Sequence, residues 1–254
     1  MRLLNRSPRF AFWLACVVMA IPTALTLAGM VQPAAIAVVN PVDIMLRDPG
    51  RISLVLLLIA LAIAPLRQLS VELATSFDCR YGKRMSDWNW LLRLRRPVGV
   101  ASFIHAVAHL AIYIVFDLDL RMQEFTLDLR DKPFVAVGTA SFLMLLPLAL
   151  TSTDGWMRRM GPYWKRLHWL IYPAAVLAAL HFILLAKPGV QQPLVFAVLL
   201  ALLLGHRMAG RRRQTRGVQE QDDGTFPERT IVTPRPRGLQ AKASHMIHTP
   251  TTKS

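Results

Sequence analysis

Histidines placed inside apolar segments are the residues of this sequence best suited to do chemistry. Four of the seven histidines, His105, His109, His168 and His181, lie in or at the end of long apolar runs. Imidazole binds metals through a ring nitrogen, and its neutral form is tolerated in hydrocarbon, where a charged side chain costs about 3 kcal/mol or more. An ionisable residue in such a position usually marks a functional site.

The depth of these histidines predicts which of them act together. His109 lies twelve residues beyond Pro97, where its segment is expected to enter the membrane, and His181 lies thirteen residues beyond His168 in another segment. At 1.5 Å per residue, both reach a depth of about 18–20 Å from the same membrane face. Histidines at matched depth on facing helices suit the two axial positions of a b-type haem. We therefore predict His109 and His181 as an axial pair.

The other histidines have a structural explanation beside a functional one. His168 is predicted to be cofactor-binding and a possible second haem site, although it lies about 140° from His181 on an ideal helix. Pro173, which lies between them, could realign the two by kinking the helix. His105, one turn before the predicted ligand of its own helix, could ligate or donate a hydrogen bond. His206 ends the last apolar run, where an interfacial histidine without a ligand role is favoured.

Six apolar runs are long enough to span a bilayer, which takes about 18 or more residues. They cover roughly residues 10–31, 52–69, 98–116, 133–151, 168–186 and 190–206. The predicted fold class is all-α, a polytopic membrane helix bundle of about six transmembrane helices. Residues 1–207 form the predicted membrane domain. Residues 208–254 are predicted to be a disordered basic cytoplasmic tail, because they lack the apolar side chains that a packed element needs.

The net charge of +15 follows a membrane topology rather than nucleic-acid binding. Arginine and lysine gather before the first run and after the second, fourth and sixth, which places both termini in the cytoplasm. The acidic segment 117–132 is assigned to the outer side. Loops are expected at Pro49-Gly50, Pro97 and Gly161-Pro162. The two cysteines form neither a disulfide framework nor a metal motif.

The sequence contains neither a Gly-x-Gly-x-x-Gly fingerprint nor a phosphate-binding loop. The chain therefore has no nucleotide-binding domain of its own, and it must receive any electrons from another molecule. A metal-ion transporter that uses the intramembrane histidines is the alternative function. The absence of carboxylates from the predicted spans counts against it. A structural membrane protein with packing histidines is the third reading.

Several short motifs together resemble a known family. They are Leu150-Thr151-Ser152-Thr153, Arg158-Arg159-Met160-Gly161, Trp164-Lys165-Arg166-Leu167-His168, Gly50-Arg51, Ala64-Pro65-Leu66-Arg67, Arg95-Arg96-Pro97-Val98-Gly99 and His109-Leu110, with Tyr113, Tyr172 and His181. The pattern resembles the haem-binding membrane subunit of the periplasmic methionine-sulfoxide reductase system, the MsrQ family. The resemblance covers about residues 40–190. The wider superfamily is the ferric-reductase-like transmembrane domain.

The resemblance implies an inner-membrane b-type cytochrome, which is an electron-transfer subunit and not the catalytic subunit. It implies haem b linked to His109, His168 and His181, and FMN as a further cofactor. The implied electron donor is the quinone pool or a flavin reductase. The implied partner is a periplasmic molybdopterin-containing enzyme that reduces methionine sulfoxide in proteins. Arg96 stands thirteen residues before His109, where a second bis-histidine haem would need a histidine. Membrane lipid, but no nucleic acid, is expected as a partner.

Overall fold

The computed structural model describes residue 21 and residues 41–186 and 191–223 of the chain. Within these residues no strand is present, and five helices are long and apolar enough to cross a membrane. These five candidate spans are Met45–Ser76, Met85–Asp117, Pro133–Leu150, Pro162–Leu184 and Gln192–Ala209. The prediction of an all-α polytopic membrane bundle is confirmed. The first predicted span, residues 10–31, lies outside the described residues except for Ile21.

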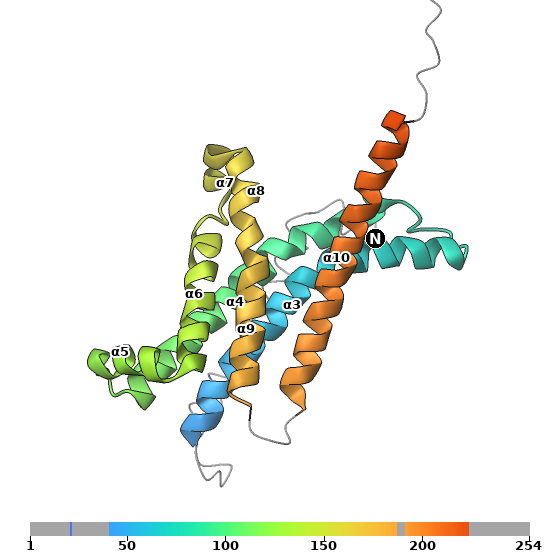
Figure 1. The fold of residues 1–254 in the computed structure, drawn as a ribbon. Coiled ribbons are helices and arrows are strands. Elements are labelled where there is room, and N and C mark those ends of the chain that lie inside the picture. Colours follow the sequence, from blue (N-terminus) through green and yellow to red (C-terminus); the bar gives the residue numbers. More distant parts are fainter. Residues whose placement is uncertain (1–20, 22–40, 187–190, 224–254) are drawn as a thin grey trace, which may run out of the picture. The chain divides into compact units, whose positions relative to one another are not determined.

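The elements follow one another as Figure 1 labels them. They are α3 (Pro41–Ser76), the 3₁₀ turn η1 (Met85–Trp88), α4 (Asn89–Ile112), the π-helical turn η2 (Tyr113–Asp117), α5 (Met122–Asp131), α6 (Pro133–Leu150), α7 (Asp154–Met160), α8 (Pro162–Leu167), the 3₁₀ turn η3 (His168–Leu170), α9 (Ile171–Leu184) and α10 (Gln192–Asp223).

Two of the predicted loops were wrong, because the prolines that suggested them lie inside helices. Pro49 and Gly50 belong to α3, and Pro97 belongs to α4. Both prolines are buried against neighbouring helices, and such packing lets an apolar helix tolerate the lost backbone hydrogen bond. Gly161-Pro162 does interrupt the chain, since Gly161 adopts φ 52° between α7 and α8. Proline suits the first turn of α8 because its missing N–H would have no partner there.

Serine side chains hold the helices together in pairs. Ser53 Oγ of α3 donates to the Ser102 carbonyl of α4 at 2.8 Å, and Ser102 Oγ donates to the Ser53 carbonyl at 2.8 Å. In the second pair, Ser141 Oγ of α6 donates to the Ala174 carbonyl of α9 at 2.9 Å. Ser102 and Ala174 are 0% exposed. Small residues at these positions let two backbones approach closely, which is how helices associate in lipid.

A shared apolar core joins α3, α6, α9 and the first part of α10. Its members include Leu57, Leu61, Leu145, Ala175 and Leu200. Helix α10 continues to Asp223, so residues 208–223 of the predicted tail are helical. Extending an existing helix requires no new nucleation, and this explains why the helix does not stop with the apolar run. Residues 224–254 lie outside the described residues.

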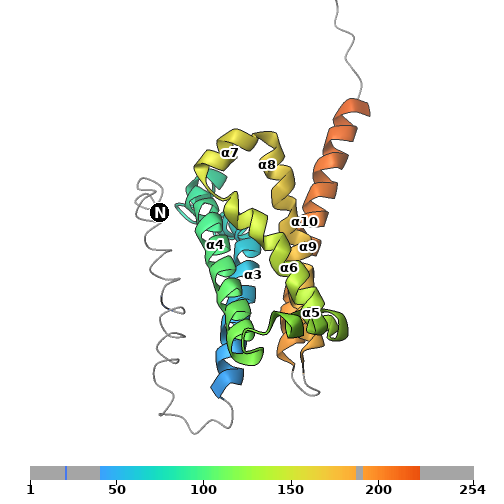
Figure 2. The same cartoon turned by 90° about the vertical axis from the view of Figure 1, so that its left-hand side faces the viewer.

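Residues 41–186 and 191–211 belong to one compact unit, and within it α5 lies at the opposite end from α7 and α8 (Figure 1 and Figure 2). The sequence predicted only a loop at α5. Asp128 of α5 accepts hydrogen bonds from Lys132, at 2.8 Å, and from the Tyr113 hydroxyl. These hydrogen bonds, that of Lys132 first, hold the pKa of Asp128 below its ordinary value. A lowered folded pKa stabilises the fold at neutral pH, and acidification through that pKa removes the stabilisation.

We expect Ser102→Ala to lower the free energy of unfolding by about 0.6 kcal/mol, the typical contribution of one interhelical hydrogen bond in a membrane. Ser102→Leu should cost about 1–3 kcal/mol more, because it forces α3 away from α4. Unfolding in mixed micelles followed by circular dichroism measures both values. Ser70→Ala is the matched control, since the Ser70 hydroxyl bonds only within its own helix, to the Leu66 carbonyl. Equal costs for the two Ser102 variants would contradict close helix packing at this point.

Candidate functional site

The structure brings together the two histidines that the sequence placed at similar depth. His109 lies in the last turn of α4, and His181 lies in the last turn of α9. Their ring centroids are 6.1 Å apart, and their planes meet at 76°. Both side chains are half-buried between apolar helices. The two rings are therefore neighbours in the fold, and the pair is the candidate site.

Each ring of the pair is held by one backbone carbonyl. His109 Nδ1 lies 2.7 Å from the Leu46 carbonyl oxygen of α3, and His181 Nδ1 lies 2.6 Å from the Phe134 carbonyl oxygen of α6. A carbonyl only accepts, so Nδ1 carries the proton and donates it in both rings. In the neutral imidazole, Nε2 then keeps its lone pair. Metal-ligating histidines have this arrangement, in which the second ring nitrogen is engaged by a carbonyl or carboxylate.

A glycine one turn after each acceptor makes both hydrogen bonds possible. Gly50 follows Leu46 by four residues, and Gly138 follows Phe134 by four. A Cβ at Gly50 would lie 3.0 Å from His109 Nδ1, and a Cβ at Gly138 would lie 2.6 Å from Nδ1 of the other ring. A side chain at either position would fill the space through which the imidazole reaches the carbonyl. Helix α3 thus holds the ring of His109 in the same way as helix α6 holds the ring of His181.

The sequence analysis missed Gly138, although one signal could have revealed it. Glycine costs about 1 kcal/mol relative to alanine inside a helix. It therefore needs a packing or functional reason in the middle of an apolar run. Gly138 stands within α6, an apolar helix. Only the fold shows that the reason is an imidazole from a different helix.

The separation of the two rings suits a metal ion between them. Two metal–nitrogen bonds of about 2 Å and two ring radii of about 1 Å give a centroid separation of about 6 Å. Among the described residues, no group of three or more His, Cys, Asp or Glu side chains could hold a metal ion. The described residues therefore offer His109 and His181 as a pair of candidate ligands.

His168 lies apart from the pair. Its ring stacks on Trp164 at 3.8 Å between centroids and 31° between planes, and its Nδ1 lies 3.1 Å from the Trp164 carbonyl oxygen. His168 precedes His181 by thirteen residues, about 20 Å along a helix. It starts the 3₁₀ turn η3, and three residues at 120° reduce the ideal angle between the two side chains from about 140° to about 80°. The tighter winding of η3, just before Pro173, therefore changes the direction of His168 relative to His181.

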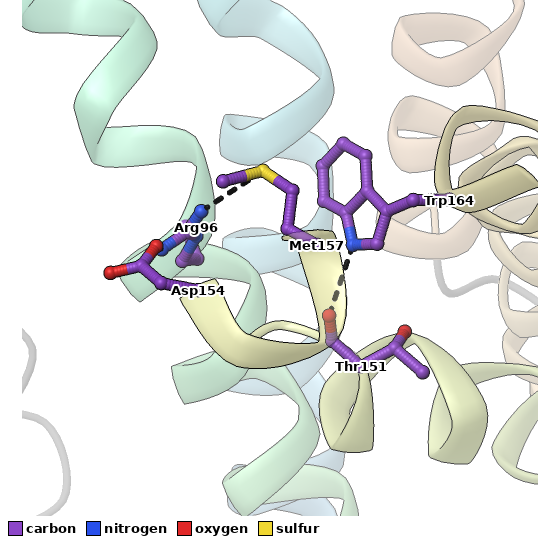
Figure 3. A network of polar contacts seen from close by, with 5 residues as sticks. All are labelled: Arg96, Thr151, Asp154, Met157 and Trp164. Carbon is purple, nitrogen blue, oxygen red and sulfur yellow. Dashed lines mark hydrogen bonds and ion pairs between the residues drawn. The ribbon is translucent and has the colours of Figure 1, made fainter. Parts of the chain in front are cut away.

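A polar network surrounds Trp164, the ring partner of His168 (Figure 3). Trp164 Nε1 donates to the Thr151 carbonyl at 3.0 Å. Arg96 of α4 forms an ion pair with Asp154 and donates to Met157 Sδ at 3.5 Å, both on α7. The Arg96 guanidinium holds the pKa of Asp154 below its ordinary value. Arg96, which stands where a second bis-histidine site would need a ligand, is instead committed to this ion pair.

The other two histidines of the described residues, His105 and His206, belong neither to the pair nor to the contact of His168 with Trp164. His105 is 3% exposed, and its Nδ1 lies 2.9 Å from the Ala101 carbonyl one turn earlier in the same helix. His206 is exposed on α10. Within the described residues, the histidines thus fall into the pair His109–His181, His168 beside Trp164, and two that take part in neither arrangement.

The fold is that of a polytopic helical membrane protein with two neighbouring intramembrane histidines. A family model matches the same part of the chain. Residues 49–179 match the family described as ferric reductase like transmembrane component. A relative from Xanthomonas oryzae pv. oryzae is 39% identical over 181 residues, which are 70% of this chain and 76% of that protein. A relative from Xanthomonas axonopodis pv. citri is 40% identical over 169 residues, 66% of this chain and 70% of its own.

A third relative, from Herminiimonas arsenicoxydans, is 36% identical over 168 residues, which cover 65% of this chain and 70% of that protein. All three relatives carry the name protein-methionine-sulfoxide reductase heme-binding subunit MsrQ. The chain belongs to the MsrQ family.

We expect Gly138→Ala to displace the His181 ring and to lower the free energy of unfolding by about 1–3 kcal/mol, as overpacking does. Gly50→Ala should cost less, because the contact there is 3.0 Å and not 2.6 Å. NMR of histidine labelled with ¹⁵N checks whether the Nδ1–H hydrogen bond is lost, and chemical unfolding gives the free energy.

Gly99→Ala and Gly205→Ala are the matched controls, since a Cβ at either helical position meets nothing within 4 Å. Alanine there should stabilise by about 0.5–1 kcal/mol. An unchanged histidine spectrum in Gly138→Ala would show that the glycine does not admit the ring.

Proposed function

We propose that this chain is the haem-binding electron-transfer subunit of a protein-methionine-sulfoxide reductase system, with His109 and His181 as the axial ligands of a haem b. The observation that carries the proposal is the pair of imidazoles with centroids 6.1 Å apart, each with Nδ1 engaged by a carbonyl. The names of the relatives support it, since those proteins are called heme-binding subunits. A haem with two axial histidines supplies reversible one-electron transfer.

The residues of this chain would serve that role in separate ways. The Leu46 and Phe134 carbonyls fix the orientation of the two rings and make Nε2 a better donor to a metal. Gly50 and Gly138 give those rings access to the carbonyls. The surrounding apolar side chains exclude water, and burial and hydrogen bonding are among the factors that set a haem potential. The helices thus act as a rigid holder, and no side chain of the pair needs to move.

The proposed direction of electron transfer rests on the family resemblance and on charge. The resemblance implies the bacterial inner membrane, and the basic loops would place both termini in the cytoplasm and the α5 end in the periplasm. The histidine pair then lies in the outer half. The acceptor would be a periplasmic molybdopterin-containing methionine-sulfoxide reductase subunit, and the donor the quinone pool or a flavin reductase. FMN binding stays a prediction of the family resemblance. No residue is assigned to it.

A metal-ion transporter fits the site less well. Ions that move along a pathway exchange among several ligands, and transporters commonly use intramembrane carboxylates for this. Among the described residues, the paired histidines are joined by no third metal-binding side chain. Both Nδ1 atoms are also fixed by backbone hydrogen bonds. Such a rigid pair suits a resident cofactor better than a passing ion.

We expect His109→Ala and His181→Ala each to abolish the low-spin haem of the pair, because one axial imidazole alone does not give a six-coordinate low-spin iron. His168→Ala should keep that haem and slow electron entry from the cytoplasmic half. The measurement is haem per chain and the reduced-minus-oxidised spectrum of purified protein. His206→Ala is the control, since it removes an exposed histidine. A normal low-spin spectrum in either pair variant would rule out the assigned ligands.

The outer segment 117–132 is less free to bind a partner than its acidity suggests. Lys132 and Tyr113 hold Asp128, and Arg121 pairs with both Glu124 and Asp119. Asp117, at the end of η2, is exposed. A partner surface with basic residues would complement this segment, and such complementarity acts mainly on the association rate.

We expect the double variant Asp117→Asn/Asp119→Asn to slow reduction of the partner subunit a few-fold at low ionic strength and to flatten its salt dependence. Haem content should not change. Stopped-flow reduction at two salt concentrations measures the effect. Glu72→Gln, which alters an exposed carboxylate in the last turns of α3, should leave the rate unaltered. Equal rates for wild type and the double variant would exclude this segment as the docking surface.

A further inference from the structure

Arg207 ties three helices together away from the histidine pair. From α10 its guanidinium donates to the Tyr172 hydroxyl of α9 and, at 3.1 Å, to the Leu61 carbonyl of α3. The guanidinium carbon also lies 5.3 Å from the centre of the Tyr172 ring, which adds a cation–π contact. One arginine side chain thus makes polar contacts inside an apolar bundle, where a charge is costly.

The Leu61 carbonyl is available because of a proline. Pro65 lies four residues later in α3 and has no N–H to complete the helical hydrogen bond to that carbonyl. Leu61 is 1% exposed, so water cannot satisfy its carbonyl. A buried carbonyl without a partner costs free energy, and Arg207 supplies the missing donor. Two of the five donors of the guanidinium are thereby engaged.

A third donor of Arg207 is buried without an acceptor. Its Nε has no hydrogen-bond partner among the described residues. A second guanidinium, that of Arg95 on α4, lies within electrostatic range of Arg207, Tyr172 and His168. In the part of the chain that the structure describes, neither arginine forms an ion pair with a carboxylate. Two positive charges close together in an apolar bundle raise the free energy of the fold, and a bound anion near both would lower it.

We propose that Arg95 and Arg207, with the Tyr172 hydroxyl, form a binding site for the phosphate or carboxylate group of a ligand at the His168 end of the bundle. Guanidinium groups bind both kinds of anion through paired hydrogen bonds. Three sources supply this chemistry: the phosphate of a phospholipid, the phosphate ester of a flavin nucleotide, and a carboxylate of a tetrapyrrole. The site is separate from the haem assigned to His109 and His181, because His181 lies nine residues beyond Tyr172, about 14 Å along α9.

The test compares full-length protein purified in mild detergent, as wild type and as Arg95→Gln, Arg207→Gln and Arg159→Gln. Phospholipid phosphorus, flavin and haem are quantified per chain in each preparation. One of the three ligands should fall about tenfold or more in both Arg95→Gln and Arg207→Gln, because each variant removes charge-assisted hydrogen bonds. The ligand that falls identifies the source of the anion. The control, Arg159→Gln, alters an exposed arginine of α7 and should retain all three.

Thermal unfolding of each variant shows whether a lost ligand reflects a lost binding group or a destabilised fold, since Arg207 also links α10 to α9 and α3. Arg207→Lys retains the positive charge and should keep more ligand than Arg207→Gln. If Arg207→Gln fails to fold, Arg95→Gln decides the question, because it leaves the bonds to Leu61 and Tyr172 intact. Unaltered amounts of all three ligands in folded Arg95→Gln would overturn the proposal. Loss of the low-spin signal of the histidine pair with no other change would point to that site and also count against it.

Discussion

The hydrogen bond from an imidazole Nδ1 to a backbone carbonyl is the interaction on which the rest of this structure depends. In an apolar bundle, an imidazole with a free N–H is costly, and a helix carbonyl normally bonds only within its own helix. Gly50 and Gly138 leave open space beside the carbonyl one turn earlier, so an imidazole from another helix can donate its N–H to that carbonyl. Each ring is then held in one tautomer, with Nε2 available to a metal. The close contacts of α3 with α4 and of α6 with α9 place each ring beside its carbonyl, and contacts of α4 with α6 and of α3 with α9 join the two helix pairs. The ring centroids of His109 and His181 are then 6.1 Å apart.

The two ends of the bundle use opposite chemistry. The end with α5 carries the neutral histidine pair and an acidic segment whose carboxylates are largely paired with their own basic neighbours. The other end gathers arginines around His168 and its tryptophan partner. Arg96 is neutralised by Asp154, whereas Arg95 and Arg207 lie within electrostatic range of each other and form no ion pair with a carboxylate among the described residues. This asymmetry suits a protein that accepts a ligand or an electron donor on one side and delivers electrons on the other.

Two prolines inside the helices contribute to the arrangement of polar side chains. Pro65 leaves the Leu61 carbonyl free, and the carbonyl becomes the anchor for Arg207. Pro173 follows the 3₁₀ turn η3, which rotates His168 relative to His181. In both cases the missing N–H of proline leaves a backbone carbonyl of the preceding turn without its helical donor. Arg207 binds the carbonyl freed by Pro65, and His168 lies close to Pro173 in the chain. Substituting these prolines would therefore alter the sites as well as the helices.

The sequence by itself determined the membrane class, five of the spans and the pairing of His109 with His181, because hydropathy and residue spacing along a helix are local properties. It misplaced the loops at Pro49-Gly50 and Pro97, since a proline stops a helix only where no neighbouring helix supports the broken turn. Only the tertiary structure decided what depends on contacts between helices. It placed Gly138 beneath an imidazole, committed Arg96 to an ion pair, and brought Arg207 from the last helix to a carbonyl freed 146 residues earlier. Such contacts join residues far apart in the chain, and no periodicity in the sequence records them.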